Sequence, residues 1–348
     1  MKIESYSPTI RRREMDAVLT TLVAEKIGPG EQSARLIQIA KEYLQFEYSL
    51  ALRSSAMALH VALEALRLDD GSGVVISALA PAYYDRVISE LRLVPVYADV
   101  EENTSNVSVE TLKAAVEGAL NNDGVKIARC MVINHSLGYV PDLPSLIEIG
   151  LPIIEDCSLS FGTNWQDKKA GAFGLFTILG MEERDLITAG GGALLYTHGR
   201  RDATVLREYS NLPSEYKLAD MNAAMAISQF KESERNYQKR KEIAQVYTQS
   251  ALRTRHKRFI TAGDSEYNNY TFPLILETGM KDVVSYSEKK EVAVELAFDQ
   301  TVMGKGLLES AHYPVANSLA LRTAVFPLYP RLSSAQVAKV AKVIATLP

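Results

Sequence analysis

The sequence predicts an α/β protein whose sheet is mainly parallel and covered by helices on both faces. Short apolar runs, typical of buried strands, alternate with longer segments that carry apolar residues at helical spacing. This alternation is typical of β–α–β units, because two parallel strands need a long connection between them. The chain has 348 residues, of which 47% are apolar, so it can bury a large core and form two domains.

The expected elements follow one another at regular intervals. Helical spacing is found at residues 14–26, 33–44, 54–66, 83–91, 109–120, 143–149, 217–247, 292–298 and 334–344. Strand-like runs are found at residues 50–52, 74–76, 94–99, 128–134, 151–155, 173–180, 190–197 and 270–276. Ser333 is a suitable N-cap for the last helix, and the Gly-Pro-Gly segment at 28–30 separates the first two.

A domain boundary is expected near residue 248, after the long helix predicted at 217–247. Residues 1–247 would form a large domain and residues 248–348 a small C-terminal domain. We leave open whether the N-terminal segment packs on the small domain. The charge-rich run at 231–242 is typical of a solvated helix face that leads between domains.

Composition and charge exclude several classes of protein. The chain has 42 acidic and 38 basic residues and a net charge of −4, so no general attraction to nucleic acid or membranes is expected. No stretch reaches the ~18 uncharged apolar residues that a membrane helix needs, and the N-terminus lacks the apolar core of a signal peptide. Cys130 and Cys157 lie in or beside apolar runs, so we expect buried thiols and a cytoplasmic protein without disulfides.

Several short motifs occur in order along nearly the whole chain. They are Gly-Pro-Gly at 28–30, residues 94–100 with Asn106, His135 with Gly138 and Asp142, the strand end at Asp156, Gly-Gly-Ala at 191–193, residues 220–230, Tyr313 with Pro314, and residues 326–331. In this order and at these spacings they resemble the DegT/DnrJ/StrS-type sugar aminotransferases, which are fold-type-I enzymes that use pyridoxal phosphate (PLP). Each motif alone is weak, but together they make a specific resemblance.

The resemblance implies a three-layer αβα large domain with a mainly parallel seven-stranded sheet, followed by a smaller α+β C-terminal domain. It also implies a homodimer, a nucleotide-sugar-like ligand and a role in amino-sugar or surface-polysaccharide biosynthesis. In the family, an aspartate at a strand end pairs with the pyridine nitrogen of PLP, and a lysine in a later loop forms a Schiff base with it. Asp156 matches that aspartate; its alternative role is to cap a neighbouring helix or turn.

The position of the Schiff-base lysine holds no amine in this chain. Counted forward from the strand at 173–180, the position falls at Glu182; counted back from the Gly-Gly pair, it allows Glu183 instead. Neither side chain can form an imine, so the usual lysine-dependent route is closed. A dehydratase branch of the family has a histidine here, but no histidine lies between residues 169 and 196.

Other positions that contact the cofactor in the family are also changed. The Ser-Gly-Thr phosphate turn reads Ser54-Ser55-Ala56, so its threonine hydroxyl is lost and its glycine has gained a side chain. Ser54 and Thr177 remain as two hydroxyls that could hold a phosphate. The other altered positions are Pro81 for a stacking aromatic residue (with Tyr83 and Tyr84 close by), Leu159 for a glutamine or histidine, and Glu215 for an asparagine given by the partner subunit. Lys168 and Lys169 align with an ordinary basic pair in a turn.

Three functions remain open. The first is a degenerate family member without transaminase activity that binds a nucleotide-sugar-like ligand or a partner protein. The second is an aminotransferase or dehydratase that uses PLP or pyridoxamine phosphate (PMP) without a covalent lysine. The third is a non-catalytic subunit paired with an active homologue. We expect no covalently bound cofactor, weak binding of PLP or PMP at most, and no metal site, because the five histidines lack ligand spacing.

Overall fold

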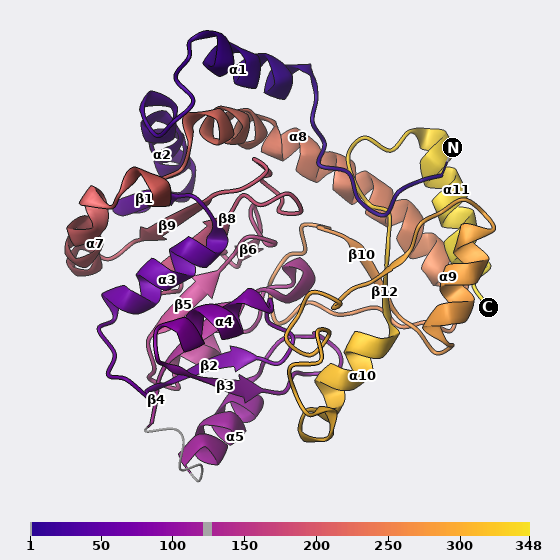
Figure 1. Cartoon of the computed structure of the whole chain (residues 1–348). Helices are drawn as coiled ribbons and strands as arrows, with labels where there is room; N and C mark the ends of the chain where they lie inside the picture. Colours follow the sequence, from indigo (N-terminus) through magenta and orange to yellow (C-terminus); the bar gives the residue numbers. More distant parts are fainter. Residues whose placement is uncertain (1, 121–126) are drawn as a thin grey trace.

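Figure 1 shows the computed structural model of the chain, in which residues 2–120 and 127–348 are described. The central sheet contains β1 (Tyr48–Leu52), β2 (Gly73–Ser77), β3 (Val94–Ala98), β4 (Ala128–Asn134), β5 (Ile153–Asp156), β8 (Phe176–Gly180) and β9 (Ala193–Thr197). Their order across the sheet is β1-β9-β8-β5-β4-β2-β3. Only β9 runs antiparallel to its neighbours, and all other pairs are parallel. The mainly parallel seven-stranded sheet is confirmed.

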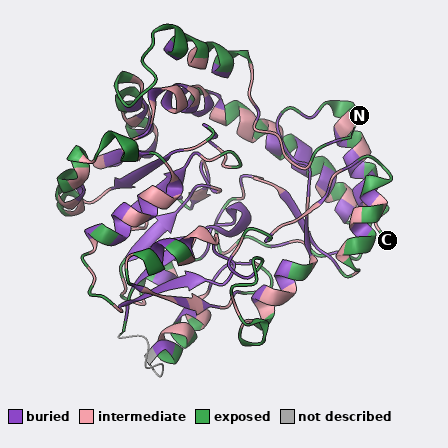
Figure 2. Cartoon of the chain, in the orientation of Figure 1, coloured by how far each residue is buried: buried purple, intermediate pink, exposed green. Residues whose placement is uncertain are grey.

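Helices cover both faces of this sheet. One face carries α3 (Ser55–Ala65), α4 (Tyr83–Glu90) and α7 (Arg200–Arg207), and the other carries α2 (Glu31–Leu44), α5 (Val109–Leu120) and α8 (Asp220–Ala251). Residues of one strand serve the two cores in turn: Val74 and Ile76 belong to the core on the α3 side, and Val75 belongs to the other. Figure 2 shows the buried sheet between helices that expose their outer sides. This is the expected three-layer αβα arrangement.

The last part of the chain forms a smaller antiparallel unit. Its sheet has the order β10-β12-β11, with β10 (Phe272–Ile275), β11 (Glu295–Leu296) and β12 (Thr323–Phe326). Its core also includes Tyr247 of α8 and Ile3, whose backbone bridges Val292, so the N-terminal segment packs on this unit. Since α8 continues without a break through residue 248, the domain boundary there remains a prediction.

The remaining elements are short or lie outside the main sheet. They are α1 (Arg12–Val23), α6 (Leu143–Ile147), α9 (Met280–Glu288), α10 (Pro314–Arg322), α11 (Ser334–Ala345) and the hairpin of β6 (Asn164–Trp165) with β7 (Lys168–Lys169). Within residues 2–120 and 127–348, no helix is both long and apolar enough to cross a membrane.

The helix predicted at 292–298 is wrong. The segment is extended and contains β11, which pairs with β12. Its apolar residues Val292, Val294, Leu296 and Phe298 stand at every second position, so one face of a strand collects them, whereas a helix would spread them around its axis. The strand predicted at 173–180 begins later, at Phe176, because the residues before it form a turn.

Candidate functional site

Three elements bring polar side chains together at the carboxyl edge of the parallel strands. Asp156 ends β5, Gly180 ends β8, and Ser55 begins α3. The contact is close, because a Cβ atom built on Gly180 would lie 2.4 Å from Asp185 Oδ2, 2.6 Å from Ser55 Oγ and 2.8 Å from Ser158 Oγ. Glycine is therefore required at position 180, where the chain leaves the sheet and enters the loop at 181–189.

Asp156 is almost completely buried and fully hydrogen-bonded. Its Oδ1 accepts from the backbone amide of Ser158 at 2.9 Å and from the Ser158 hydroxyl at 2.5 Å. Its Oδ2 accepts from the hydroxyl of Tyr84 at 2.5 Å and, at 3.5 Å, from that of Tyr83. Burial raises the pKa of both tyrosines well above its usual range, and the neighbouring Asp156 raises it further, so both hydroxyls remain donors.

The start of α3 is bonded to the chain's own side chains. Ser54 is the N-cap, and its hydroxyl accepts from the amide of Met57 at 3.1 Å. The amide of Ser55 donates to Glu182 Oε1 at 3.0 Å. A carboxylate is well placed here because the first amides of a helix point outward and carry partial positive charge. Glu182, predicted from the sequence as the lysine position, thus lies against the turn predicted to hold phosphate.

Asp185 also belongs to this cluster, although the sequence identified it only as part of a charged loop and not as a site residue. Its Oδ2 accepts from the amide of Glu182 at 2.8 Å, and its own amide donates to the Glu182 carbonyl at 3.2 Å. Loss of solvent raises the pKa of Asp185 to about 7, and the charges of Asp156 and Glu182 raise it as well. The signal in the sequence was an acid three residues after Glu182, a spacing at which a carboxylate can cap a turn.

Other predicted residues lie away from the cluster. Glu183 is exposed, and its backbone carbonyl accepts from the hydroxyls of Tyr6 and Thr188. Thr177 is fully buried and donates to the carbonyl of Gly171 at 3.0 Å. Since Phe176 and Ile178 pack on the α3 side, the alternation of the strand places the Thr177 side chain on the opposite face. The structure therefore does not bring its hydroxyl to the start of α3.

No lysine replaces the missing amine in the described part of the chain. Lys169 donates to the carbonyl of Tyr43 and lies 3.6 Å from the centre of the Tyr43 ring, and Lys168 pairs with Trp165 in a hairpin. Within residues 2–120 and 127–348, no hydrogen bond or ion pair joins a lysine to Asp156, Glu182 or Asp185. No group of residues there is suited to hold a metal ion.

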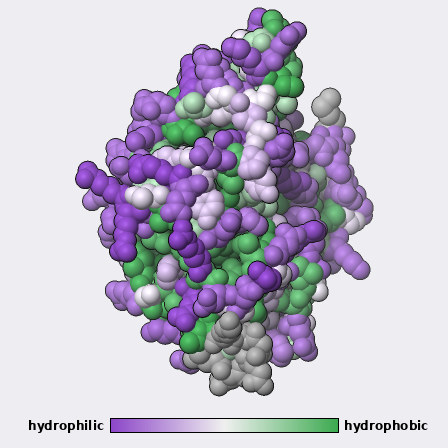
Figure 3. All heavy atoms as spheres, turned by 60° about the vertical axis from the view of Figure 1, so that its left-hand side comes forward, coloured by the Kyte–Doolittle hydropathy of each residue, from purple (hydrophilic) through white to green (hydrophobic). Residues whose placement is uncertain are grey.

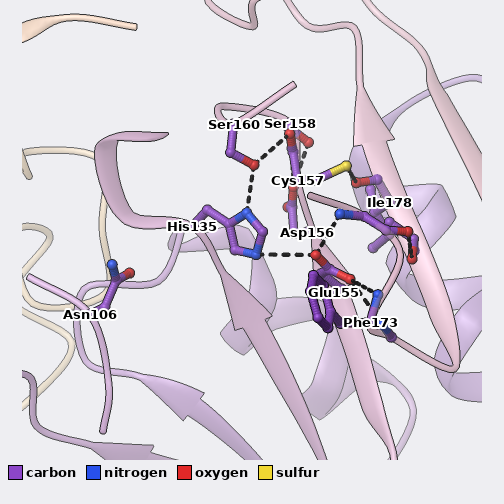
Figure 4. A network of polar contacts seen from close by, with 12 residues as sticks. Asn106, His135, Glu155, Asp156, Cys157, Ser158, Ser160, Phe173 and Ile178 are labelled. Atoms are coloured by element: carbon purple, nitrogen blue, oxygen red, sulfur yellow. Dashed lines mark hydrogen bonds and ion pairs between the residues drawn. The ribbon is translucent and has the colours of Figure 1, made fainter. Parts of the chain in front are cut away.

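A second polar network lies deeper, beside Asp156 (Figure 4). Glu155 accepts from the amides of Gly171, Phe173 and Gly174 at 2.6, 2.9 and 2.9 Å, which fixes the turn before β8. His135 lies between Glu155, 3.4 Å from its Nε2, and a serine hydroxyl 2.5 Å from its Nδ1. Burial lowers the pKa of His135 to about 3 and raises that of Glu155 to about 7. Because both side chains are inaccessible to solvent, this network supports the fold rather than a reaction.

The residues at the edge of the sheet do not fit a lysine-bound PLP. An amine is absent, and the phosphate would meet Glu182 at the start of α3. Asp156, which could face a pyridinium nitrogen, is already bonded to Tyr84 and Ser158. Asp156 and Glu182 bring negative charge to this position, which raises the pKa of Asp185 and is unfavourable for an anionic cofactor.

The sequence of this chain is similar to those of known sugar aminotransferases. The sequence profile described as the DegT/DnrJ/EryC1/StrS aminotransferase family matches residues 8–345. The GDP-perosamine synthase of Vibrio cholerae is 22% identical over 328 residues, which are 87% of this chain and 87% of that protein.

Solved structures of similar proteins superpose over almost the entire chain. An aminotransferase named after the same family from Brucella abortus matches with a TM-score of 0.86 and 20% identity, covering 95% of this chain and 94% of that one. The Helicobacter pylori aminotransferase PseC, involved in the biosynthesis of pseudoaminic acid, matches with a TM-score of 0.84 and 17% identity, covering 99% and 98%. At these identities the structures establish the fold, and the profile match over residues 8–345 establishes the family. The chain belongs to the DegT/DnrJ/EryC1/StrS aminotransferase family.

Proposed function

We propose that this chain is a degenerate member of its family, without lysine-dependent transaminase activity. The observation that carries the proposal is the position of Glu182, whose carboxylate accepts from the amide of Ser55 where the family places its lysine and its phosphate. Transfer of an amino group through a Schiff base needs an amine held at the cofactor, and a carboxylate cannot provide it. The role would then be binding, of a nucleotide-sugar-like ligand or a partner protein, in amino-sugar or surface-polysaccharide biosynthesis in the cytoplasm.

A homodimer is part of this proposal, and the surface of α1 supports it. This helix buries Glu14 and Thr21 and exposes apolar side chains, the reverse of the usual pattern for a helix on a monomer. Met15, Leu19 and Val23 are spaced by four residues and are 57%, 57% and 76% exposed. Hydrophobic residues also gather at the top of the molecule in Figure 3, where α1 lies in Figure 1. Such a stripe is suited to burial against a second copy.

The same stripe would also suit a related subunit. In that case the chain would be the non-catalytic partner of an active homologue and could contribute residues to its site. Co-purification of a lysine-containing homologue from the source organism would favour this assembly over the homodimer.

A second candidate is an enzyme that uses PLP or PMP without a covalent lysine. The retained Asp156 favours it, because that carboxylate could still hold a pyridinium nitrogen protonated. The two functions differ in a simple observation. Purified protein with an absorption band from bound cofactor would support the enzyme, whereas a protein without such a band after addition of PLP would support the binding role.

Borohydride reduction tests the proposal directly. The protein is incubated with PLP, reduced, digested and mapped by mass spectrometry, with a lysine-containing family aminotransferase as the positive control. We expect the control to carry a phosphopyridoxyl group on one lysine in full yield, and this chain to carry only scattered, substoichiometric labels. A stoichiometric adduct on a single lysine of this chain would falsify the proposal.

A further inference from the structure

We propose that the chain fills its own cofactor site: the Glu182 carboxylate takes the place of a phosphate group at the start of α3, and the Tyr84 hydroxyl takes the place of a pyridinium at Asp156. This inference rests on the proposed function and extends it, because a site that has merely lost a lysine would still be open to a phosphorylated ligand. A filled site binds no such ligand until an internal group is removed.

The start of α3 shows the first replacement. Three amides, those of Ser55, Ala56 and Met57, point outward in the first turn, and such a set holds phosphate in many proteins. Two of them are already used, by Glu182 at 3.0 Å and by the Ser54 hydroxyl at 3.1 Å. Glu182 brings to this position what a phosphate would bring, namely negative charge and an acceptor oxygen.

The Gly-rich turn at 190–192 lies near the Glu182 carboxylate. A Cβ built on Gly191 would lie 3.7 Å from Glu182 Oε2 and 3.9 Å from the Arg53 carbonyl oxygen, both ordinary van der Waals distances. Gly191 adopts φ +138°, a conformation that a side chain would make costly. The turn therefore leaves room for the Glu182 carboxylate at the start of α3.

Asp156 shows the second replacement. The Tyr84 hydroxyl donates to it at 2.5 Å, and Tyr84 is completely buried, with its ring edge-on to Tyr83 at a centroid distance of 4.9 Å. A pyridinium N–H would need one of the two Asp156 carboxylate oxygens, and both already accept hydrogen bonds within the chain. Because the donor is held by a packed helix, displacing it would leave a buried hydroxyl without a partner.

A segment from the C-terminal part of the chain supports the tyrosine pair. Pro81, at the position of the family's stacking aromatic residue, bridges Thr301, and the amide of Ala82 donates to the carbonyl of Gln300 at 3.0 Å. The amide of Val302 donates to the carbonyl of Ala80 at 2.9 Å. These bonds fix residues 80–82, which lead directly into α4 and its tyrosines.

Chemical rescue by inorganic phosphate tests the replacement. We compare thermal unfolding of the wild type, Glu182→Ala and the control Glu183→Ala, which removes an exposed carboxylate one residue away. Each is titrated with phosphate, and with chloride at the same ionic strength. We expect Glu182→Ala to lower Tm by a few degrees, and phosphate to restore it in a saturable manner. The wild type and Glu183→Ala should show no saturable response to phosphate.

Several outcomes would overturn the inference. They are equal Tm values for the two alanine variants, a Glu182→Ala protein that does not respond to phosphate, or a wild type that phosphate stabilises as strongly as the variant. If Glu182→Ala does not fold, Glu182→Gln keeps the acceptor and removes the charge; we expect its Tm to lie below that of the wild type, and an unchanged Tm refutes the charge replacement. These results are separate from the borohydride experiment, because a covalent lysine adduct would refute the proposed function, whereas failed rescue refutes only the internal replacement.

Discussion

The carboxyl group of Asp185 should make the protein less stable as the pH rises from about 4 to about 7. Its pKa is raised from an ordinary value of 3.8 to about 7, first by loss of solvent and then by the charges of Asp156 and Glu182. Between these two values the unfolded chain releases a proton that the folded chain keeps, so the unfolded state gains stability as the pH rises. The protonated form of Asp185 therefore stabilises the fold fully below pH ~4, and this contribution is lost by pH ~7.

The change Asp185→Asn removes this titration and preserves the shape. The asparagine carbonyl can still accept from the amide of Glu182, as Oδ2 does at 2.8 Å. The full difference between the two pKa values corresponds to about 4 kcal/mol, since one pKa unit is about 1.4 kcal/mol. Asp185 keeps some contact with solvent, which reduces the effect, so we expect the variant to gain about 1 to 3 kcal/mol over the wild type between pH 4 and pH 8.

Urea unfolding at a series of pH values measures this effect. Glu183→Gln is the matched control, because it neutralises an exposed acid in the same loop and should follow the wild type at every pH. Glu155, whose pKa is also about 7, contributes to the slope of all three proteins and cancels in the differences. If the wild type and Asp185→Asn keep a constant difference from pH 4 to pH 8, Asp185 does not titrate in this range, and the account of three crowded carboxylates is wrong.

Two further predictions concern the scaffold. The Asp220 carboxylate accepts from the amides of Gly30, Gln32 and Ser33 at 2.9 Å; burial opposes its ionisation, but the hydrogen bonds from Ser33 and the backbone lower its pKa. Asp220→Asn should therefore reduce the free energy of unfolding by about 1 to 3 kcal/mol near pH 7. This loss should disappear as the pH falls below the pKa of Asp220, which acid unfolding curves of the two proteins would show. Light scattering at micromolar concentration should give the mass of a dimer. Replacement of the exposed Leu19 on α1 by a charged residue should shift the measured mass towards that of the 38.4 kDa monomer. A wild type that is already monomeric would contradict the dimer.

The sheet was predictable because its strands are nearly continuous apolar runs. In a parallel sheet covered on both faces, neighbouring positions such as Val74 and Val75 serve opposite cores, so the sequence shows an uninterrupted run that is easily recognised. The error at 292–298 arose where the chain is only half-buried. Apolar residues do stand at every second position there, but a short apolar segment between charged residues fits either a helix or a strand. The segment is a strand because it pairs with β12.

The candidate site was predictable by position but not by contact. Alignment with the family placed Glu182 at the lysine and Ser54-Ser55 at the phosphate turn, yet nothing in the spacing showed that the Glu182 carboxylate reaches the Ser55 amide. Asp185 was missed because its role depends on the path of the loop, which brings it back against Gly180. Tyr84 was noted only as a neighbour of Pro81, since its hydrogen bond to Asp156 depends on how α4 packs on the sheet.

The hydrogen bonds of Asp156 also change how its retention in this chain is interpreted. From the sequence, Asp156 is the strongest argument for a surviving cofactor, although an acid at a strand end can instead cap a neighbouring helix or turn. In the structure its carboxylate accepts one hydrogen bond from Tyr84 and two from Ser158, which is a structural role that needs no ligand. If these hydrogen bonds are its only role, replacement of Asp156 should destabilise the packing of α4 and the turn after β5, and the acid would be retained for stability alone. A retained family residue is therefore weak support for a retained reaction when each of its hydrogen bonds has found a partner within the chain.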